Sequence, residues 1–195
     1  MTAARIGVFG GSFDPIHNGH LAAASAVQQA MNLDRVLFVP AGDQWQKHLS
    51  ASAQDRLAMV AVAIDQHPGF EVSDVDVRRS GATYTVDTLK ELQSQNPDSN
   101  LFFILGTDAA AGLQSWKSPV ELLNLAEFVV VTRPGSDFSE PDFAVGRLTR
   151  FEFDALDLSS TSMRSKLKSG NTATGEVPES VLDYIQEHNL YKEPR

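Results

Sequence analysis

The sequence contains no cysteine. A disulfide framework, a cysteine-ligated zinc site and a catalytic thiol are therefore all excluded. Basic residues are also scarce, because 16 lysines and arginines stand against 25 aspartates and glutamates, which gives a formal net charge of −9 at pH 7. A general nucleic-acid binder presents a surplus of positive charge to the phosphate backbone, so we expect no nucleic-acid partner. A local pocket for a small nucleotide is still allowed.

Long apolar runs are missing as well. No stretch approaches the roughly 18 consecutive apolar residues that a membrane helix needs. The segment MTAARIGVFGG is too short for the apolar region and cleavage site of a signal peptide. We therefore expect a cytoplasmic protein with no membrane partner. The 195 residues, 42% of them hydrophobic, suit one domain spanning 1–195. A helical part at about 159–191 is expected to pack on it, and the sequence leaves formation of a homo-oligomer open.

The chain does contain an alternation of short apolar runs and helical patterns. Four runs bounded by turn residues predict strands buried on both faces, at residues 6–9, 36–39, 101–105 and 128–132. Helical patterns begin near residues 18, 53, 86 and 118, and a closing amphipathic helix is expected at 178–189. This alternation predicts an α/β fold with a doubly wound, mostly parallel, Rossmann-like sheet and right-handed crossovers.

Two of the expected helix starts carry capping signals. Ser52 and Asp55 resemble a capping box, and Ser118 precedes a proline in the first helical position, with Glu121 three residues after the cap. The segment 136–146 is polar and interrupted by proline, so it is interpreted as a mobile loop.

Ligands of doubly wound folds bind beyond the carboxyl ends of the strands, near the point where the strand order reverses. Four segments follow predicted strands, and we expect all of them to open on one edge of the sheet. These segments are 10–20, 42–48, 106–108 and 133–135.

The first of these segments, in the stretch GGSFDPIHNGHL, places two histidines behind a glycine pair. Gly10 and Gly11 allow backbone N–H groups to approach a ligand, and a helix start near Asn18 adds donors and the positive end of a helix dipole. The stretch has neither the GK[ST] of a P-loop nor a GxGxxG fingerprint. His17 and His20 would then donate to phosphate oxygens and stabilise an in-line transition state. A helix-capping histidine with a surface one, or a two-histidine metal site, are the alternatives.

Two separated motifs resemble one family. GSFDPIHNGH is similar to the (H/T)xGH motif of the nucleotidylyltransferase superfamily, and LSSTSMRSKL at residues 158–167 is similar to its second signature, ISSTxxR. The motifs occur in the expected order, and the resemblance covers nearly the whole chain. Members of the superfamily join a phosphate or phosphonucleotide to the AMP part of ATP and release pyrophosphate. The resemblance implies the same α/β nucleotidylyltransferase fold for this chain.

The segments between the motifs resemble the branch that acts on nicotinate mononucleotide. This resemblance implies ATP and nicotinate mononucleotide as substrates and nicotinate adenine dinucleotide (deamido-NAD) and pyrophosphate as products, in NAD biosynthesis. The nucleotide phosphate would attack the α-phosphorus in line, with no covalent intermediate. Mg²⁺ would come with ATP, bound mainly by its phosphates and water, and no protein metal cage is expected.

The same resemblance implies the residues of the site. The expected catalytic residues are His17, His20, Lys47 and Arg164. Those expected to bind ATP are Gly10, Gly11, Ser12, His20, Gly106, Asp108, Arg133, Ser160, Thr161 and Arg164, and those expected to bind the nicotinate nucleotide are Phe13, Lys47, Thr83, Tyr84, Thr85 and Trp116. Asp108 would accept from ribose hydroxyls, Arg133 would lie over adenine and Trp116 would stack on the pyridine ring. Taken alone, these are a strand exit, an exposed loop arginine and an ordinary core or surface aromatic.

One segment departs from the family pattern. Many bacterial relatives carry a PPHK-type run after the second strand, whereas this chain has GDQWQKHL, in which Lys47 still matches the phosphate-contacting lysine and the role of Trp45 is open. Two rival functions share part of this pattern. Phosphopantetheine adenylyltransferases open on a similar loop, but they tend to be shorter and lack the TYT and Trp116 segments. A non-catalytic nucleotide sensor would be expected to have lost its phosphate-handling groups.

Overall fold

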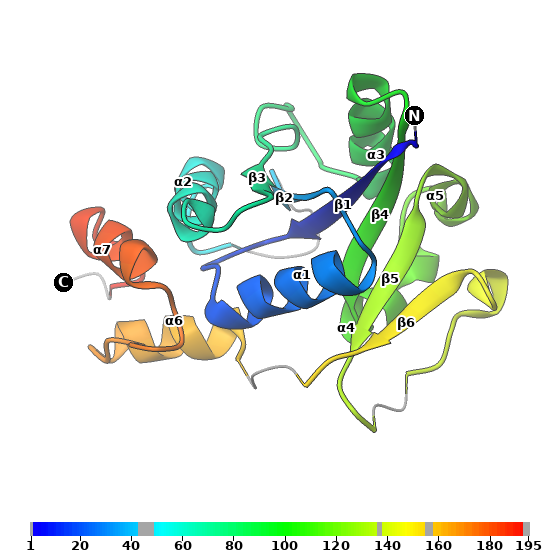
Figure 1. Cartoon of the computed structure of the whole chain (residues 1–195). Helices are drawn as coiled ribbons and strands as arrows, with labels where there is room; N and C mark the ends of the chain where they lie inside the picture. Colours follow the sequence, from blue (N-terminus) through cyan, green and yellow to red (C-terminus); the bar gives the residue numbers. More distant parts are fainter. Residues whose placement is uncertain (1, 43–48, 136–137, 155–157, 193–195) are drawn as a thin grey trace.

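A six-stranded sheet, parallel throughout, forms the centre of the protein in the computed structural model, which describes residues 2–42, 49–135, 138–154 and 158–192 (Figure 1). The strand order is β3-β2-β1-β4-β5-β6. The strands are β1 (Ala4–Gly11), β2 (Arg35–Pro40), β3 (Phe70–Val72), β4 (Ser99–Gly106), β5 (Glu127–Thr132) and β6 (Leu148–Glu152). The predicted doubly wound parallel sheet is therefore confirmed, and its order is the Rossmann order.

The helices are α1 (Asn18–Ala30), α2 (Ala53–Ile64), α3 (Thr85–Gln95), α4 (Thr107–Ala111), α5 (Pro119–Leu125), α6 (Ser160–Lys168) and α7 (Glu179–Glu187), with short 3-10 turns at η1 (Leu113–Ser115) and η2 (Asp142–Ala144). Helices α1, α2, α3, α5 and α7 begin within one residue of their predicted starts, whereas α4 was not predicted. Ser52 caps α2 as predicted, because its hydroxyl accepts from the backbone N–H of Asp55.

Two apolar layers cover the two faces of the sheet. On one face, α1, α2, α6 and α7 contribute buried residues to a cluster around Phe38 and Ile104. On the other face, α3, α4 and α5 pack on a cluster around Phe103 and Val130. Neighbouring residues of one strand alternate between the two clusters, as the period of a strand requires. Figure 1 shows the two helical layers on either side of the sheet.

Three features were not predicted. The edge strands β3 and β6 are short and partly polar, so neither presents the continuous apolar run of a strand buried on both faces. The predicted capping role of Ser118 is wrong: its backbone is left-handed, with φ of 52°, and its side chain makes no cap hydrogen bond. Pro119 in the first helical position and the acidic Glu121 in the first turn support the start of α5. Within the segment interpreted as a mobile loop, η2 forms a short turn, and residues 136–137 lie outside the described residues.

The strand order explains where a ligand can bind. From β1 the chain passes to β2 on one side, whereas β4 lies on the other side of β1. The loops after β1 and β4 therefore diverge and leave a crevice at the carboxyl edge of the sheet.

Candidate active site

A cleft of about 1080 Å³ lies at the carboxyl edge of the sheet. Its walls come from the loops after β1, β4 and β5, the starts of α1, α3 and α6, and the segment around Trp116. Every predicted site residue that the structure describes lines this cleft. Lys47 and Trp45 lie in residues 43–48, outside the described residues, so the prediction for Lys47 stays a prediction. Four loops were expected at this edge, and the described parts of all four are there.

The histidine pair stands at the first turn of α1. His17 occupies the cap position with an extended backbone, and its ring stacks on that of His20, with centroids 3.7 Å apart and planes at 22°. The backbone N–H of His17 donates to Nδ1 of His20 at 3.2 Å. In a neutral imidazole with Nδ1 accepting, the proton is on Nε2, so His20 presents a donor from its other nitrogen. The pair shares a capping role, but neither histidine is a surface residue.

Burial lowers the pKa of both histidines. The pKa of His17 falls to about 4 because its side chain is taken out of water. The pKa of His20 falls well below 6.5 for the same reason, and a positive charge on the stacked His17 ring lowers it further. Both rings are therefore neutral at pH 7 in the ligand-free protein. A bound polyphosphate would raise both pKa values, since negative charge favours imidazolium.

These shifts predict a stability that falls on acidification. Between pH 6.5 and about 4 the unfolded chain protonates His17 while the folded protein does not, so the free energy of unfolding must fall as the pH drops through this window. From pH 7 to pH 5, His17 alone should account for about 2 kcal/mol. Urea unfolding at both pH values, compared with His17→Asn, measures this contribution. An equally large loss of unfolding free energy in His17→Asn between the two pH values would contradict the lowered pKa of His17.

Aromatic packing and a glycine hold the two rings. His20 lies edge-on to Phe13, with centroids 5.2 Å apart, and Phe13 itself is only 2% exposed. A Cβ on Gly19 would come 3.1 Å from Nδ1 of His17 and 3.6 Å from Cβ of Leu158, so glycine lets the ring lie against the helix start. A Cβ on Gly11 would come 2.9 Å from the Phe13 ring. Phe13 lines the cleft but mainly packs beneath His20.

The expected free donors at the start of α1 are partly used. The N–H of Asn18 donates to the carbonyl of Glu176 at 2.9 Å, and the N–H of His20 donates to the carbonyl of His17. Two of the first three N–H groups of α1 are thus committed within the protein, and the imidazoles lie beside them in the cleft.

The second motif is bonded directly to the first. The Ser160 hydroxyl donates to the carbonyl of Pro15 at 2.9 Å, and Nη1 of Arg164 donates to the carbonyl of Asp14 at 2.7 Å. Nη2 of Arg164 donates to the Thr161 hydroxyl at 3.2 Å. Since the Ser160 hydroxyl is committed as a donor, its backbone N–H in the first turn of α6 is the group left for an anion.

Two buried charged residues that were not predicted brace these loops. Arg56 is 1% exposed and donates to the carbonyls of Ser12, Ala41 and Gly42, which joins the loops after β1 and β2. The only sequence signal for this role is its position on the apolar face of α2, in line with Met59 and Val60. Asp14 is also 1% exposed, and its carboxylate accepts from several elements at once.

The residues predicted for the acceptor lie at the start of α3 and beside η1. Tyr84 caps α3, with Thr85 as its first residue, so the positive end of this 11-residue helix faces the cleft. The Thr83 hydroxyl is buried and has no hydrogen-bond partner among the described residues. Trp116 is half-buried and lies edge-on to Phe103, with centroids 6.0 Å apart. Lys117, which was not predicted, lies over the Tyr84 ring at 4.6 Å and lines the cleft.

The remaining predicted residues border the loops after β4 and β5. Gly106 caps α4, and a Cβ there would meet no atom within 4 Å. Asp108 in the first turn of α4 and Arg133 after β5 are both exposed at the cleft. All three residues line the cleft, and their predicted contacts stay predictions.

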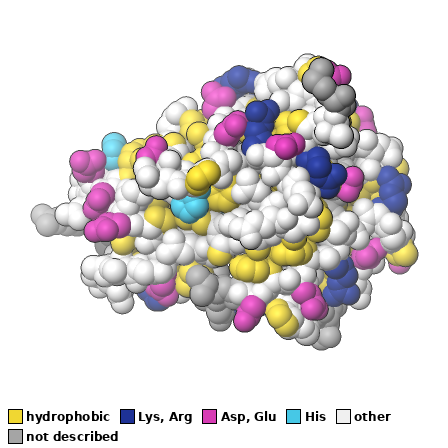
Figure 2. Space-filling view, viewed as in Figure 1, with side chains coloured by type: hydrophobic (Ala, Val, Ile, Leu, Met, Phe, Trp, Pro, Cys, Tyr) yellow, Lys and Arg dark blue, Asp and Glu magenta, His cyan; other side chains and the backbone are white. Residues whose placement is uncertain are grey.

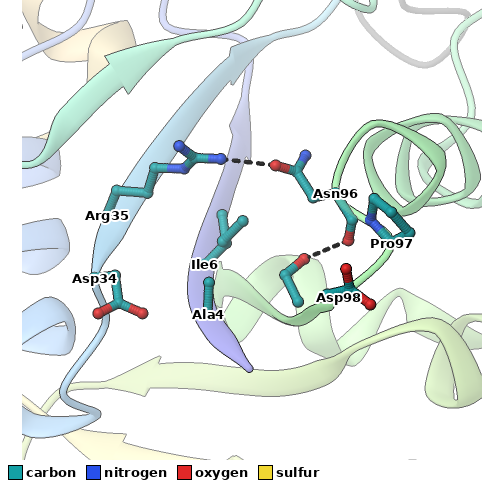
Figure 3. A pocket seen from close by; sticks show the side chains of 8 residues that line it. Ala4, Ile6, Asp34, Arg35, Asn96, Pro97 and Asp98 are labelled. Carbon is teal, nitrogen blue, oxygen red and sulfur yellow. Dashed lines mark hydrogen bonds between the residues drawn. The ribbon is translucent and has the colours of Figure 1, made fainter. Parts of the chain in front are cut away.

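A smaller hollow of about 250 Å³ lies at the opposite edge of the sheet (Figure 3). Two hydrogen bonds tie its polar groups together: Nη2 of Arg35 donates to Oδ1 of Asn96 at 2.7 Å, and the Ser99 hydroxyl donates to the backbone carbonyl of Asn96. No residue of the predicted site lies there. The large cleft is thus the candidate active site.

Within the described part of the chain, no group of three or more histidine, aspartate or glutamate side chains is placed to hold a metal ion. No described helix is long and apolar enough to cross a membrane. On the face shown in Figure 2, Lys and Arg side chains are scattered among acidic ones and form no continuous basic patch.

The fold and the cleft define a class of protein: an α/β protein with a cleft at the switch point of a parallel sheet. Known proteins that are similar to this chain belong to the same class. The sequence model of the cytidylyltransferase-like family matches residues 8–166. A probable nicotinate-nucleotide adenylyltransferase of Clavibacter michiganensis subsp. michiganensis is 47% identical over 98% of this chain and 96% of its own length. One of Leifsonia xyli subsp. xyli is 47% identical over 96% of this chain and 94% of its own length.

A solved structure shares the fold. The nicotinic acid mononucleotide adenylyltransferase of Plasmodium falciparum, complexed with NaAD, superposes with a TM-score of 0.79 at 22% identity, over 96% of this chain and 97% of that chain. The chain belongs to the cytidylyltransferase-like family and, within it, to the nicotinate-nucleotide adenylyltransferases.

Proposed function

We propose that this chain transfers AMP from ATP to nicotinate mononucleotide and releases pyrophosphate, forming nicotinate adenine dinucleotide in NAD biosynthesis. The observation that carries the proposal is the stacked pair of His17 and His20 in one cleft with two further groups of predicted residues. Gly106, Asp108 and Arg133 form one group, and Trp116 and the start of α3 form the other. Two nucleotides bound to these groups would bring their phosphates together at the histidines.

The chemistry needs no nucleophile from the protein. The 5′-phosphate of nicotinate mononucleotide attacks the α-phosphorus of ATP, the bond to the bridging oxygen breaks, and pyrophosphate leaves with that electron pair. Charge grows on the equatorial and leaving oxygens, where His17 and His20 donate. Holding the two phosphates in line replaces an encounter of two anions by an intramolecular step.

Other cleft residues would bind the remaining phosphates of ATP. The first turn of α6, with the N–H groups of Ser160 and Thr161 and the Arg164 guanidinium, would bind the β- and γ-phosphates. Two of the five N–H donors of the Arg164 guanidinium bond within the protein, and the others would donate to a ligand. Gly10, Gly11 and Ser12 also line the cleft. Lys47 is added to these phosphate-binding residues on the basis of the family resemblance alone.

On the acceptor side, the start of α3 would receive the nicotinate carboxylate. The N–H groups of Thr85 and Val86 belong to its first turn, and the unpartnered Thr83 hydroxyl lies beside them in sequence. Trp116 would stack on the pyridine ring. A carboxylate gains from the helix dipole, and a neutral amide gains less, which favours the acid over the amide.

Mg²⁺ fits this cleft as an ion carried by ATP. Among the carboxylates that line the described cleft, Asp14 and Asp76 already accept hydrogen bonds from the protein, which leaves Asp108 exposed. Bound to the phosphates and water, the ion would neutralise charge on the leaving pyrophosphate.

The experiment is an assay of pyrophosphate release from ATP, with nicotinate mononucleotide, its amide analogue and phosphopantetheine offered separately. We expect the fastest release with nicotinate mononucleotide. Fastest release with phosphopantetheine would favour the enzymatic rival. No release with any acceptor would favour a nucleotide-binding protein without activity.

Trp116→Ala is expected to raise KM for nicotinate mononucleotide about 10-fold and to leave KM for ATP within about twofold. The reason is that stacking of a base or ring on an aromatic side chain contributes on the order of 1–3 kcal/mol. Steady-state kinetics with each substrate varied in turn measures the two constants. Equal increases in both would argue against stacking on the pyridine ring.

We also propose that residues 1–195 act as one domain in the cytoplasm. In support, α7 is bonded to α2, since Tyr184 donates to Asp55 at 3.1 Å and Ser180 donates to the carbonyl of Val62 at 3.0 Å. Formation of a homo-oligomer remains a prediction that size-exclusion chromatography with light scattering would test.

A further inference from the structure

The last turn of the described chain reaches the loop that carries the histidines. Tyr191 follows α7 and is 8% exposed, and its hydroxyl donates to Oδ1 of Asp14 at 2.7 Å. The two residues are 177 positions apart in sequence. A buried tyrosine hydroxyl needs an acceptor, and here that acceptor is a carboxylate beside the candidate active site.

Asp14 joins three other parts of the chain to this loop. Its carboxylate also accepts from the backbone N–H groups of Ser50, at 2.7 Å, and Ala51, at 3.1 Å. Its own carbonyl accepts from Arg164 of α6 at 2.7 Å, and Nη1 of that guanidinium lies 4.0 Å from Oδ2. Four donors therefore converge on one residue, which is 1% exposed. Removal of any one of these donors changes the geometry and strength of the other hydrogen bonds to Asp14.

The segment between Asp14 and His17 is held by a hydrogen bond and by burial. The carbonyl of Pro15 is held by Ser160, Ile16 is fully buried, and His17 is 5% exposed. A displacement of Asp14 must therefore be taken up by packed core atoms or passed on to the His17 ring. A shift of about 1 Å at a reacting group can cost about 100-fold in rate.

We propose that Tyr191 is a positioning residue: its hydroxyl fixes the Asp14 carboxylate, and Asp14 fixes the orientation of the His17 and His20 rings. This inference rests on the proposed adenylyl transfer for its kinetic consequence only. The C-terminal turn is thereby part of the catalytic apparatus, although Tyr191 does not line the cleft.

The test uses two tyrosines of the C-terminal part. Tyr191→Phe keeps the ring and removes the hydrogen bond to Asp14. Tyr184→Phe is the matched control, because it removes a hydrogen bond to another carboxylate, Asp55, whose residue does not line the cleft. We expect Tyr191→Phe to lower kcat about 10-fold with KM for both substrates within about twofold, since groups that act in the transition state are displaced. Tyr184→Phe should stay within about twofold of the unchanged protein.

A second measurement needs no turnover. In NMR spectra of the ligand-free protein, the imidazole signals of His17 and His20 should shift in Tyr191→Phe and stay in place in Tyr184→Phe. The control should instead move the signal of His188, whose ring stacks on Tyr184 at 4.0 Å. Unchanged signals of His17 and His20 in Tyr191→Phe would overturn the inference, whatever the enzyme proves to catalyse.

Asp14→Asn completes the test as a double-mutant cycle. If Tyr191 acts through Asp14, the added Tyr191→Phe change should leave kcat of Asp14→Asn nearly unaltered. Equal kcat in the two tyrosine variants, a change in KM alone, or additive losses in the double variant would each overturn the inference. If Asp14→Asn does not fold, the two tyrosine variants still decide. Absence of activity in the unchanged protein would count against the proposed function only, because the NMR comparison stands independently.

Discussion

His20→Ala is expected to lower kcat for dinucleotide formation by at least about 100-fold, because it removes one donor aimed at the transition state. The Nδ1 atom of His20 is held by the His17 backbone, so the ring has a fixed orientation and offers its Nε2 side to the ligand. A donor that is already oriented costs no reorganisation when charge develops on the phosphate oxygens. KM values should change much less than kcat.

Two further variants make this result specific. His188→Ala removes an exposed histidine outside the cleft and should leave kcat unchanged. His20→Gln keeps an N–H donor on a side chain of similar reach and should recover part of the lost rate. Circular dichroism and thermal unfolding verify that each variant is folded. A folded His20→Ala protein with nearly normal kcat would contradict the role assigned to the histidine.

Arg56→Met is expected to lower the free energy of unfolding by about 4 kcal/mol. The substitution keeps an apolar stem in the buried space but leaves the carbonyls of Ser12, Ala41 and Gly42 without their common donor. Each buried polar group left without a partner costs on the order of 1–3 kcal/mol. Denaturant titration followed by fluorescence measures the loss.

Arg78→Met is the matched control for this prediction. The Arg78 side chain is 51% exposed and pairs with Asp74 and Glu91 at the surface. Exposed ion pairs contribute at most about 1 kcal/mol, so this variant should lose no more than that. Similar losses of unfolding free energy in the two variants would show that the three hydrogen bonds of Arg56 to carbonyls do not account for its contribution to stability.

The central part of the fold could be predicted because its strands are buried on both faces. The apolar runs of β1, β2, β4 and β5 follow directly from that burial. The edge strands β3 and β6 have one paired neighbour each and mix polar with apolar residues, so no local pattern distinguishes them from loop. Their strand state is set by pairing with β2 and β5, which is a long-range effect.

The composition of the cleft could be predicted for a different reason. Two sequence motifs mark loops and helix starts that the strand order must bring to one edge. What the motifs do not reveal is which groups are already committed within the protein. Ser160, predicted to bind ATP, donates its hydroxyl to the carbonyl of Pro15, and Asp14, which is not among the predicted site residues, is a buried acceptor shared by several elements. Contacts between residues about 150 positions apart leave no local signal in a single sequence.

The claim that His17 and His20 act as donors and never as a nucleophile is tested most directly by the stereochemical course of the reaction. The measurement uses ATP whose α-phosphorus is made chiral by one sulfur, with nicotinate mononucleotide as acceptor, and the configuration of the product is read by phosphorus NMR. A single in-line displacement predicts inversion at phosphorus. Retention would require two displacements, hence a covalent nucleotidyl-enzyme intermediate, and would contradict the mechanism built on these two rings.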